Sequence, residues 1–133
     1  MAALLRTMLL HPAISREVHA SSRTGWWAWA LQRVTGVLLT GYLLLHIAVI
    51  STSQLGADTF DDVLKFVQHP VFAALNIVLI AIVLYHSFNG VRIVLFDVGV
   101  GIRQQASAFW TCVALTIAGT GASAVLSIPL IFR

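Results

Sequence analysis

The stretch Leu84–Asp97, LYHSFNGVRIVLFD, places a histidine, an arginine and an aspartate at the end of an otherwise continuous apolar run. Ionisable side chains are costly inside a membrane span, and those found there usually mark a functional site. His86, Arg92 and Asp97 therefore set the functional question for the whole chain. A histidine within the apolar part of the run suggests a metal ligand.

The composition of the chain defines its class. Of its 133 residues, 59% are hydrophobic and only 10% are charged, and the mean hydropathy is +0.90, so too few polar residues remain to cover a globular surface. Three apolar stretches separate the charged clusters, and each is long enough for the roughly 20 helical residues that cross a bilayer. We predict an all-α integral membrane protein with one domain over residues 1–133 and three transmembrane helices at 27–50, 71–98 and 108–132.

The basic residues indicate orientation rather than nucleic-acid binding. Although the net charge is +3, the arginines are spread along the chain and flank apolar helices. Cytoplasmic flanks of membrane spans carry an excess of Lys and Arg. We therefore place the N-terminal arm, residues 1–25, and the 92–103 connection in the cytoplasm, with the acidic 51–70 loop and the C-terminus outside. The arm either lies on the bilayer or docks a soluble partner.

Several smaller features predict how the helices sit and pack. Tryptophans crowd the start of the first span, where amphipathic rings prefer the headgroup level. Ala114, Ala118 and Ala122 recur every four residues, which favours packing against another transmembrane helix. The sequence of the 51–70 loop predicts a short amphipathic helix whose N-terminus is capped by Asp58 or Thr59. The single cysteine indicates neither a disulfide framework nor a thiolate metal site.

Two histidines lie within the predicted spans. Neutral imidazole is a common axial ligand of haem iron, so His86 is a candidate haem ligand, with a buried hydrogen-bonded histidine as the alternative. His46 is either a second haem ligand or a satisfied core histidine. Counting about 1.5 Å per helical residue from Arg33 and Arg92 places the two histidines at different depths. They are therefore not expected to bind the same iron, and each would need a partner histidine from another chain.

Arg33, Arg92 and Asp97 all fall towards the predicted cytoplasmic end. Guanidinium groups suit haem propionates or a quinone carbonyl, because they stay protonated and bind oxygen in a planar fork. Asp97 could exchange a proton near the same boundary. The alternative is that the arginines only anchor the topology and that Arg92 pairs with Asp97.

Two segments together carry a family resemblance. WALQRVTGVLL, residues 29–39, and LYHSFNGVRIVLFDVG, residues 84–99, resemble the two signature regions of the cytochrome b membrane-anchor subunit of succinate dehydrogenase, respiratory complex II. The likeness covers the full three-helix plan. It implies that the three helices form half of a two-chain anchor bundle.

The resemblance implies a heterotetramer that passes electrons from succinate to a membrane quinone. Its partners would be a flavoprotein, an iron–sulfur subunit and a second anchor chain, with haem b shared between the anchors. The expected location is the bacterial cytoplasmic membrane, with the mitochondrial inner membrane as the alternative. Two other functions stay open: a purely structural anchor with a dispensable haem, and the equivalent subunit of a fumarate reductase.

Residue by residue, the resemblance assigns His86 as the axial haem ligand, with the other axial histidine on the second anchor. Arg33 matches the arginine beside the quinone and a haem propionate. Asp97 matches the acidic residue near the quinone site, and Arg92 the arginine next to it. His46 resembles the first-helix histidine of family branches with two haems, so the complex would hold one haem or two.

The sequence departs from the family pattern at two positions before Arg33. Trp29 stands where familiar single-haem members have a quinone-binding serine, and Gln32 stands where a histidine is often found. Trp29 is therefore the expected quinone or propionate contact at that place, with Ser21 or Ser22 as substitutes for the missing hydroxyl.

Overall fold

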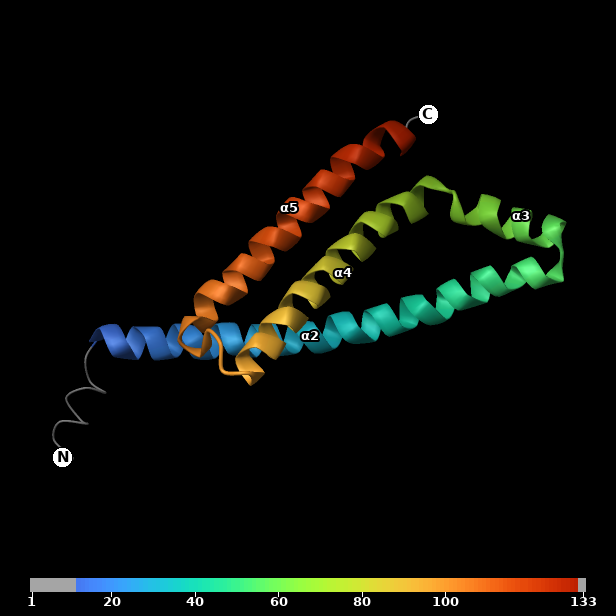
Figure 1. Cartoon of the computed structure of the whole chain (residues 1–133). Coiled ribbons are helices and arrows are strands. Elements are labelled where there is room, and N and C mark those ends of the chain that lie inside the picture. The colour runs from blue at the N-terminus through green and yellow to red at the C-terminus, as the bar shows by residue number, and fades with distance from the viewer. Residues whose placement is uncertain (1–11, 132–133) are drawn as a thin grey trace.

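The computed structural model describes residues 12–131, which are almost entirely helical and contain no strand (Figure 1). In chain order the elements are α2 (Pro12–Ser51), the 3-10 turn η1 (Thr52–Leu55), α3 (Ala57–Val67), α4 (Pro70–Asp97), the 3-10 turn η2 (Ile102–Gln104) and α5 (Gln105–Ile131). Three segments within the described range are long and apolar enough to cross a membrane: Arg23–Leu55, Pro70–Asp97 and Ile102–Ser127. The predicted all-α membrane fold is confirmed.

The first span is longer than predicted. α2 begins at Pro12 rather than near Trp27 and runs unbroken to Ser51. Proline is tolerated at the start of a helix because the first backbone N–H groups have no intrahelical partner. The part of the arm that the structure describes therefore continues the first transmembrane helix, while residues 1–11 of the arm lie outside the described range. The other predicted boundaries lie within three residues of the observed ones.

The loop between the first two spans contains the predicted short helix, but its cap differs. α3 starts after Gly56, whose φ of 114° suits glycine, and no side chain caps the helix. Asp58 lies inside the first turn, where its charge favours the helix dipole, so the prediction that Asp58 or Thr59 caps the helix is wrong. α4 follows with His69 as its N-cap and Pro70 in its first turn.

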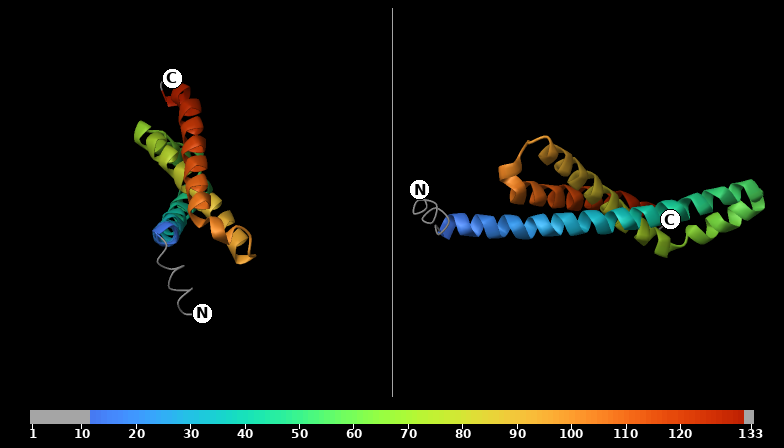
Figure 2. Two further views of the ribbon diagram at one scale, coloured as in Figure 1. Left: turned by 90° about the vertical axis from the view of Figure 1, so that its left-hand side faces the viewer. Right: turned by 90° about the horizontal axis from the view of Figure 1, so that it is seen from below.

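The C-terminal end of α4 and the N-terminal end of α5 meet α2 partway along its length, and the helices spread apart from there (Figure 1). α4 and α5 run antiparallel, side by side, and lean across α2, while α3 bridges from the end of α2 back to α4 (Figures 1 and 2). The small core lies where the three long helices meet. It consists of Ala28, Tyr85 and Phe109, with Leu31 and Val113 packed against it. We call this region the junction.

Outside the junction, most apolar side chains face outward. Only 6%, 6% and 17% of the residues in the apolar windows of the three spans are buried within the chain. α5 packs closely on α4 at Gly119, whereas Ala114, Ala118 and Ala122 are exposed. Lipid or another protein must therefore cover these faces, and the alanine row remains a predicted contact for another helix.

Candidate functional site

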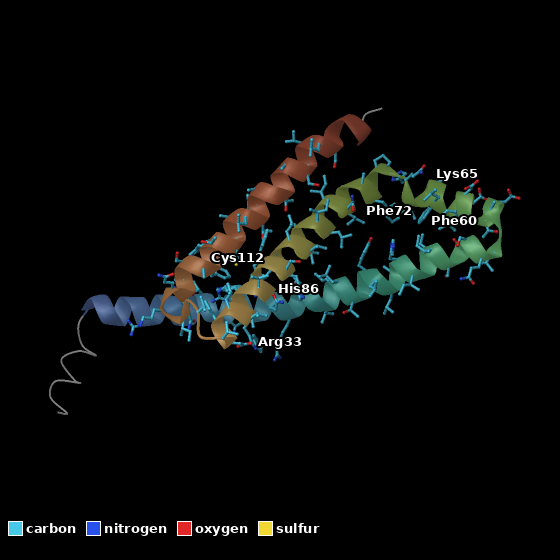
Figure 3. The ribbon with its side chains drawn as sticks, viewed as in Figure 1. Arg33, Phe60, Lys65, Phe72, His86 and Cys112 are labelled. Atoms are coloured by element: carbon cyan, nitrogen blue, oxygen red, sulfur yellow. The ribbon has the colours of Figure 1, made fainter. Side chains whose placement is uncertain are left out.

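His86 lies on α4, and its imidazole ring faces α2 (Figure 3). The ring lies against Gly36, where an added Cβ atom would be only 3.3 Å from the His86 Cε1 atom. On the same side, the Thr35 hydroxyl oxygen lies 3.0 Å from His86 Nδ1. The histidine is half-buried, while Thr35 is 7% exposed. The glycine thus allows the ring to approach α2 closely enough to reach the threonine.

The Thr35 contact favours a proton on Nδ1 of His86. The Thr35 hydroxyl has a single hydrogen, and the backbone oxygens of Leu31 and Gln32 lie 2.7 Å and 3.2 Å from it as acceptors. When the hydroxyl donates to one of them, its oxygen accepts a hydrogen bond from Nδ1–H of His86. The other ring nitrogen, Nε2, then carries the lone pair, which is the form that a metal requires.

An open groove of about 900 Å³ lies beside His86. That volume is in the range of small-molecule sites. Its lining residues are Gln32, Arg33, Gly36, Val37, Leu39, Thr40, Gly41, Leu43 and His86. The Arg33 guanidinium carbon stacks over the Trp29 ring at 4.2 Å from the centroid. The groove therefore combines apolar walls with one imidazole, from His86, and one guanidinium, from Arg33.

A second polar group lies inside the junction. Asn89 has no exposed surface, and its amide nitrogen is 3.2 Å from the Ala28 carbonyl oxygen and 2.9 Å from Gln32 Oε1. Its Oδ1 accepts from Arg92 Nη1 at 3.2 Å. The Gln32 amide nitrogen lies 3.4 Å from the His86 carbonyl oxygen and 3.5 Å from His86 Nε2. The buried amides therefore connect Arg92 to His86.

Arg92 and Asp97 do not line the groove described above. Arg92 is 7% exposed, its Nη2 lies 3.5 Å from the Gln105 carbonyl oxygen, and its guanidinium stacks over Phe96 at 4.5 Å. Asp97 is exposed at the last residue of α4. Among residues 23–127, whose side chains the structure describes, the ion pair is Lys65–Asp62. The alternative in which Arg92 pairs with Asp97 is therefore not seen.

His46 lies apart from this site. It is exposed on α2, and its ring stacks on Tyr42 with centroids 5.6 Å apart. It comes ten residues after Gly36, the residue that faces His86, a rise of about 15 Å along a helix. The two histidines therefore occupy different depths, as predicted. Among the described residues, no three His, Cys, Asp or Glu side chains gather into a group that could hold a metal ion.

The sequence did not predict the roles of Gln32, Thr35 and Asn89. Gln32 stood out only as a replacement for a histidine, yet all three side chains contact His86 or one another. The available signal was the presence of the Gln32 and Asn89 amides within apolar spans, because a buried amide needs hydrogen-bond partners from its neighbours. The identity of those partners required the crossing of α2 and α4.

Comparison with known proteins now assigns the fold to a family. A family model described as the succinate dehydrogenase/fumarate reductase transmembrane subunit matches residues 8–123. The chain belongs to this family. Membership confirms the predicted relationship to membrane-anchor subunits of succinate dehydrogenase.

Three individual proteins that are similar to this chain carry names that agree with the family assignment. The succinate dehydrogenase hydrophobic membrane anchor subunit of Halobacterium salinarum is 36% identical over 106 residues, which are 79% of this chain and 78% of the relative. Succinate dehydrogenase 2 membrane subunit SdhC of Mycobacterium tuberculosis is 29% identical over 65% of this chain and 64% of its own length. The hydrophobic membrane anchor subunit of Archaeoglobus fulgidus is 32% identical over 60% of this chain and 68% of its own.

Proposed function

We propose that this membrane-anchor subunit binds haem b through His86 and takes part in electron transfer between succinate and a membrane quinone. The observation that carries the proposal is the geometry of His86. Its Nδ1 lies 3.0 Å from the Thr35 hydroxyl, which has a backbone oxygen for its own hydrogen and can accept from Nδ1–H. The Nε2 lone pair then has only a long 3.5 Å contact with the Gln32 nitrogen, and both residues line the groove. An imidazole held in this way is ready to ligate a metal.

The residues around the groove fit a haem. Gly36 and Gly41 leave part of the α2 face flat, and Val37, Leu39 and Leu43 supply apolar walls. Arg33 is exposed at the groove, where its guanidinium suits a propionate or a quinone carbonyl. When bound, the haem would supply a one-electron redox centre. The second axial histidine would come from the other anchor subunit.

The proposal extends to partners and location. The chain would join a second anchor, an iron–sulfur subunit and a flavoprotein in the bacterial cytoplasmic membrane, with its N-terminus in the cytoplasm. Trp29 stacks on Arg33 and would contact quinone or propionate from that position. Asp97 is exposed and could exchange a proton with quinone, and Arg92 would act from inside the junction. His46 would ligate a second haem if the complex holds two.

The test is the change His86→Ala in the assembled complex, with His69→Ala as the matched control. Loss of the imidazole should abolish the reduced-minus-oxidised haem spectrum and lower the haem-to-flavin ratio, because His86 supplies the imidazole among the residues that line the groove. His69 lies in the outer loop as the N-cap of α4, so its replacement should keep full haem content. Unchanged haem content in the His86 variant would refute the proposal.

The same complexes distinguish electron transfer from a purely structural role. His46→Ala should keep the spectrum of a single-haem complex and should halve the haem-to-flavin ratio of a two-haem complex. Succinate–quinone activity that stays normal after haem is lost from the His86 variant would support the structural anchor with a dispensable haem.

A further inference from the structure

Asn89 is the largest fully buried side chain among the residues whose burial is described. A buried amide has fixed needs, because its oxygen can only accept and its nitrogen can only donate hydrogen bonds. Asn89 lies on α4 and contacts both α2 and the Arg92 guanidinium. Its orientation therefore determines which polar atom each neighbour must present.

Arg92 sets that orientation. A guanidinium has only donors, so the Asn89 atom 3.2 Å from Arg92 Nη1 must be the oxygen. The amide nitrogen then points at α2, where the Ala28 carbonyl oxygen accepts from it at 3.2 Å. A reversed Asn89 amide would place its oxygen against this backbone oxygen. Two independent contacts thus give the same orientation.

Asn89 in turn sets the orientation of Gln32. The Asn89 nitrogen donates to Gln32 Oε1 at 2.9 Å, so the Gln32 nitrogen must face His86. A second contact again agrees, since this nitrogen lies 3.4 Å from the His86 carbonyl oxygen, which can only accept. Gln32 therefore presents a donor, and never an acceptor, to His86 Nε2 at 3.5 Å.

We propose that Arg92, Asn89 and Gln32 form a directional hydrogen-bond chain that fixes the tautomer of His86, with the proton on Nδ1 and the lone pair of Nε2 at the groove. Thr35 completes the chain from the other side by accepting from Nδ1. Arg92, Asn89 and Gln32 are positioning residues, because they act through His86. The tautomer of His86 follows from contacts within the chain, whereas the statement that Nε2 binds haem iron rests on the proposed function.

This arrangement prepares Nε2 without blocking it. The contact between the Gln32 nitrogen and Nε2 is 3.5 Å, which is long for a hydrogen bond and correspondingly weak. Gln32 can release Nε2 and stay bonded to the His86 carbonyl oxygen and to Asn89. A metal at Nε2 would thus replace one weak contact and leave the rest of the chain in place.

The test reads the tautomer directly by ¹⁵N NMR of the imidazole in the full-length chain, labelled at histidine and placed in lipid nanodiscs without haem. The His86 signals are assigned by their loss in His86→Ala. In the wild type, Nδ1 should carry the proton and Nε2 should appear unprotonated. This measurement needs no haem, so it does not depend on whether haem is the ligand.

Asn89→Asp tests the direction of the chain with an almost isosteric change. The new carboxylate still accepts from Arg92, but it can no longer donate to Gln32. Gln32 should turn its nitrogen to this carboxylate and its oxygen to His86, which favours a proton on Nε2. The ratio of Nδ1–H to Nε2–H tautomer should fall by about tenfold, the effect of reversing one buried hydrogen bond. Gln104→Glu, the same chemical change at an exposed site, should leave the ratio unchanged.

A second variant covers failure of Asn89→Asp to fold, which circular dichroism would reveal. Gln32→Glu places an acceptor directly against Nε2 and should shift the tautomer in the same direction. A wild-type imidazole with its proton on Nε2, or an unchanged ratio in either folded variant, would overturn the inference.

Haem titration of the same preparations, with the second anchor subunit present, separates the inference from the proposed function. Asn89→Asp should weaken haem binding by about 10–100-fold, as expected when a partner of a ligating histidine is changed. If the tautomer shifts as expected but haem binds equally well to His86→Ala, the proposed function fails and the hydrogen-bond chain stands. If haem binding requires His86 but the tautomer ratio does not change in the variants, the hydrogen-bond chain fails and the proposed function stands.

Discussion

At the scale of single residues, Gly36 controls how closely the His86 ring approaches α2. In Gly36→Ala the new Cβ would lie 3.3 Å from Cε1 and 3.9 Å from Nδ1 of the imidazole. The ring cannot retreat without lengthening its bond to Thr35, so Nε2 should move by a few tenths of an ångström. We expect haem affinity of the assembled complex to fall by about tenfold, measured by haem titration.

Gly25→Ala is the matched control for this change. Gly25 lies on the same helix but does not line the groove, and a Cβ there would come no closer than 3.8 Å to a neighbouring atom, which is an ordinary contact. Both substitutions bring the same gain in helix propensity, about 1 kcal/mol in an exposed helix, so only the contact with His86 distinguishes them. Equal haem affinities in the two variants would show that Gly36 has no special role in seating the ring.

The sequence predicts the ionisable residues of the site better than their neutral partners. His86 and Arg33 are conspicuous because charge is rare in these spans, and they share a groove. Thr35 and Asn89 each make their contacts between α2 and α4. The periodicity of a single helix does not show which residues of two crossing helices lie opposite each other. The alternative Arg92–Asp97 pair does not form because residues five apart lie about 140° apart around a helix.

At the scale of elements, α4 and α5 depend on the contact between Leu84 and Gly119. A Cβ at Gly119 would lie 2.8 Å from Leu84 Cδ1, too close for a normal contact. Gly119→Ala should therefore force the end of the flexible Leu84 side chain to move. The expected cost lies at the lower end of the range for overpacking, about 1 kcal/mol, so we expect a slightly lower midpoint of thermal unfolding in detergent.

Two further variants show whether the loss comes from this contact. Gly121→Ala adds the same methyl group two residues away, where nothing lies within 4 Å, and should leave the midpoint unchanged or raise it. Leu84→Ala should be destabilising alone, but it should make Gly119→Ala harmless in the double variant, because the clashing atom is gone. Additive losses in the double variant would contradict the packing argument.

The three spans are predicted well because each is a long apolar run bounded by polar residues. The start of α2 is predicted poorly, because tryptophans at the membrane interface indicate the depth of the membrane surface and not the end of the helix. Pro12 is compatible with a helix start, and the helix passes through Trp26 and Trp27 without a break. The cap of α3 is missed for a different reason: Gly56 ends the preceding turn with a positive φ and leaves Asp58 inside the helix.

At the scale of the whole molecule, the chain shields little of its own apolar surface. The core is confined to the junction, and the second half of α2 is almost entirely exposed, with Leu44 65% and Leu45 69% exposed. A soluble protein would hide such residues, so lipid or other membrane helices must surround them. The exposed outer face of α2 carries His46, which would therefore meet a ligand only together with a covering subunit.

The orientation in the membrane is the last prediction, and it concerns the chain as a whole. α4 is a single span, so the loop before it and the connection after it must open on opposite sides. The connection carries Arg103, whereas the loop carries three aspartates and one lysine. By the positive-inside rule we expect the connection to face the cytoplasm. Cysteines introduced as Arg103→Cys and Asp61→Cys should therefore react with a membrane-impermeant maleimide from opposite sides.

The experiment compares right-side-out spheroplasts with inverted vesicles. Asp61→Cys should label only in spheroplasts and Arg103→Cys only in inverted vesicles, because both positions are exposed in the structure. The native Cys112 is an internal control, since it is 7% exposed within the junction side of α5 and should stay unlabelled in both. Exchanged sides would reverse the predicted orientation and leave the fold intact. Labelling of both cysteines from one side would contradict α4 as a membrane span, and with it the three-span architecture that positions His86.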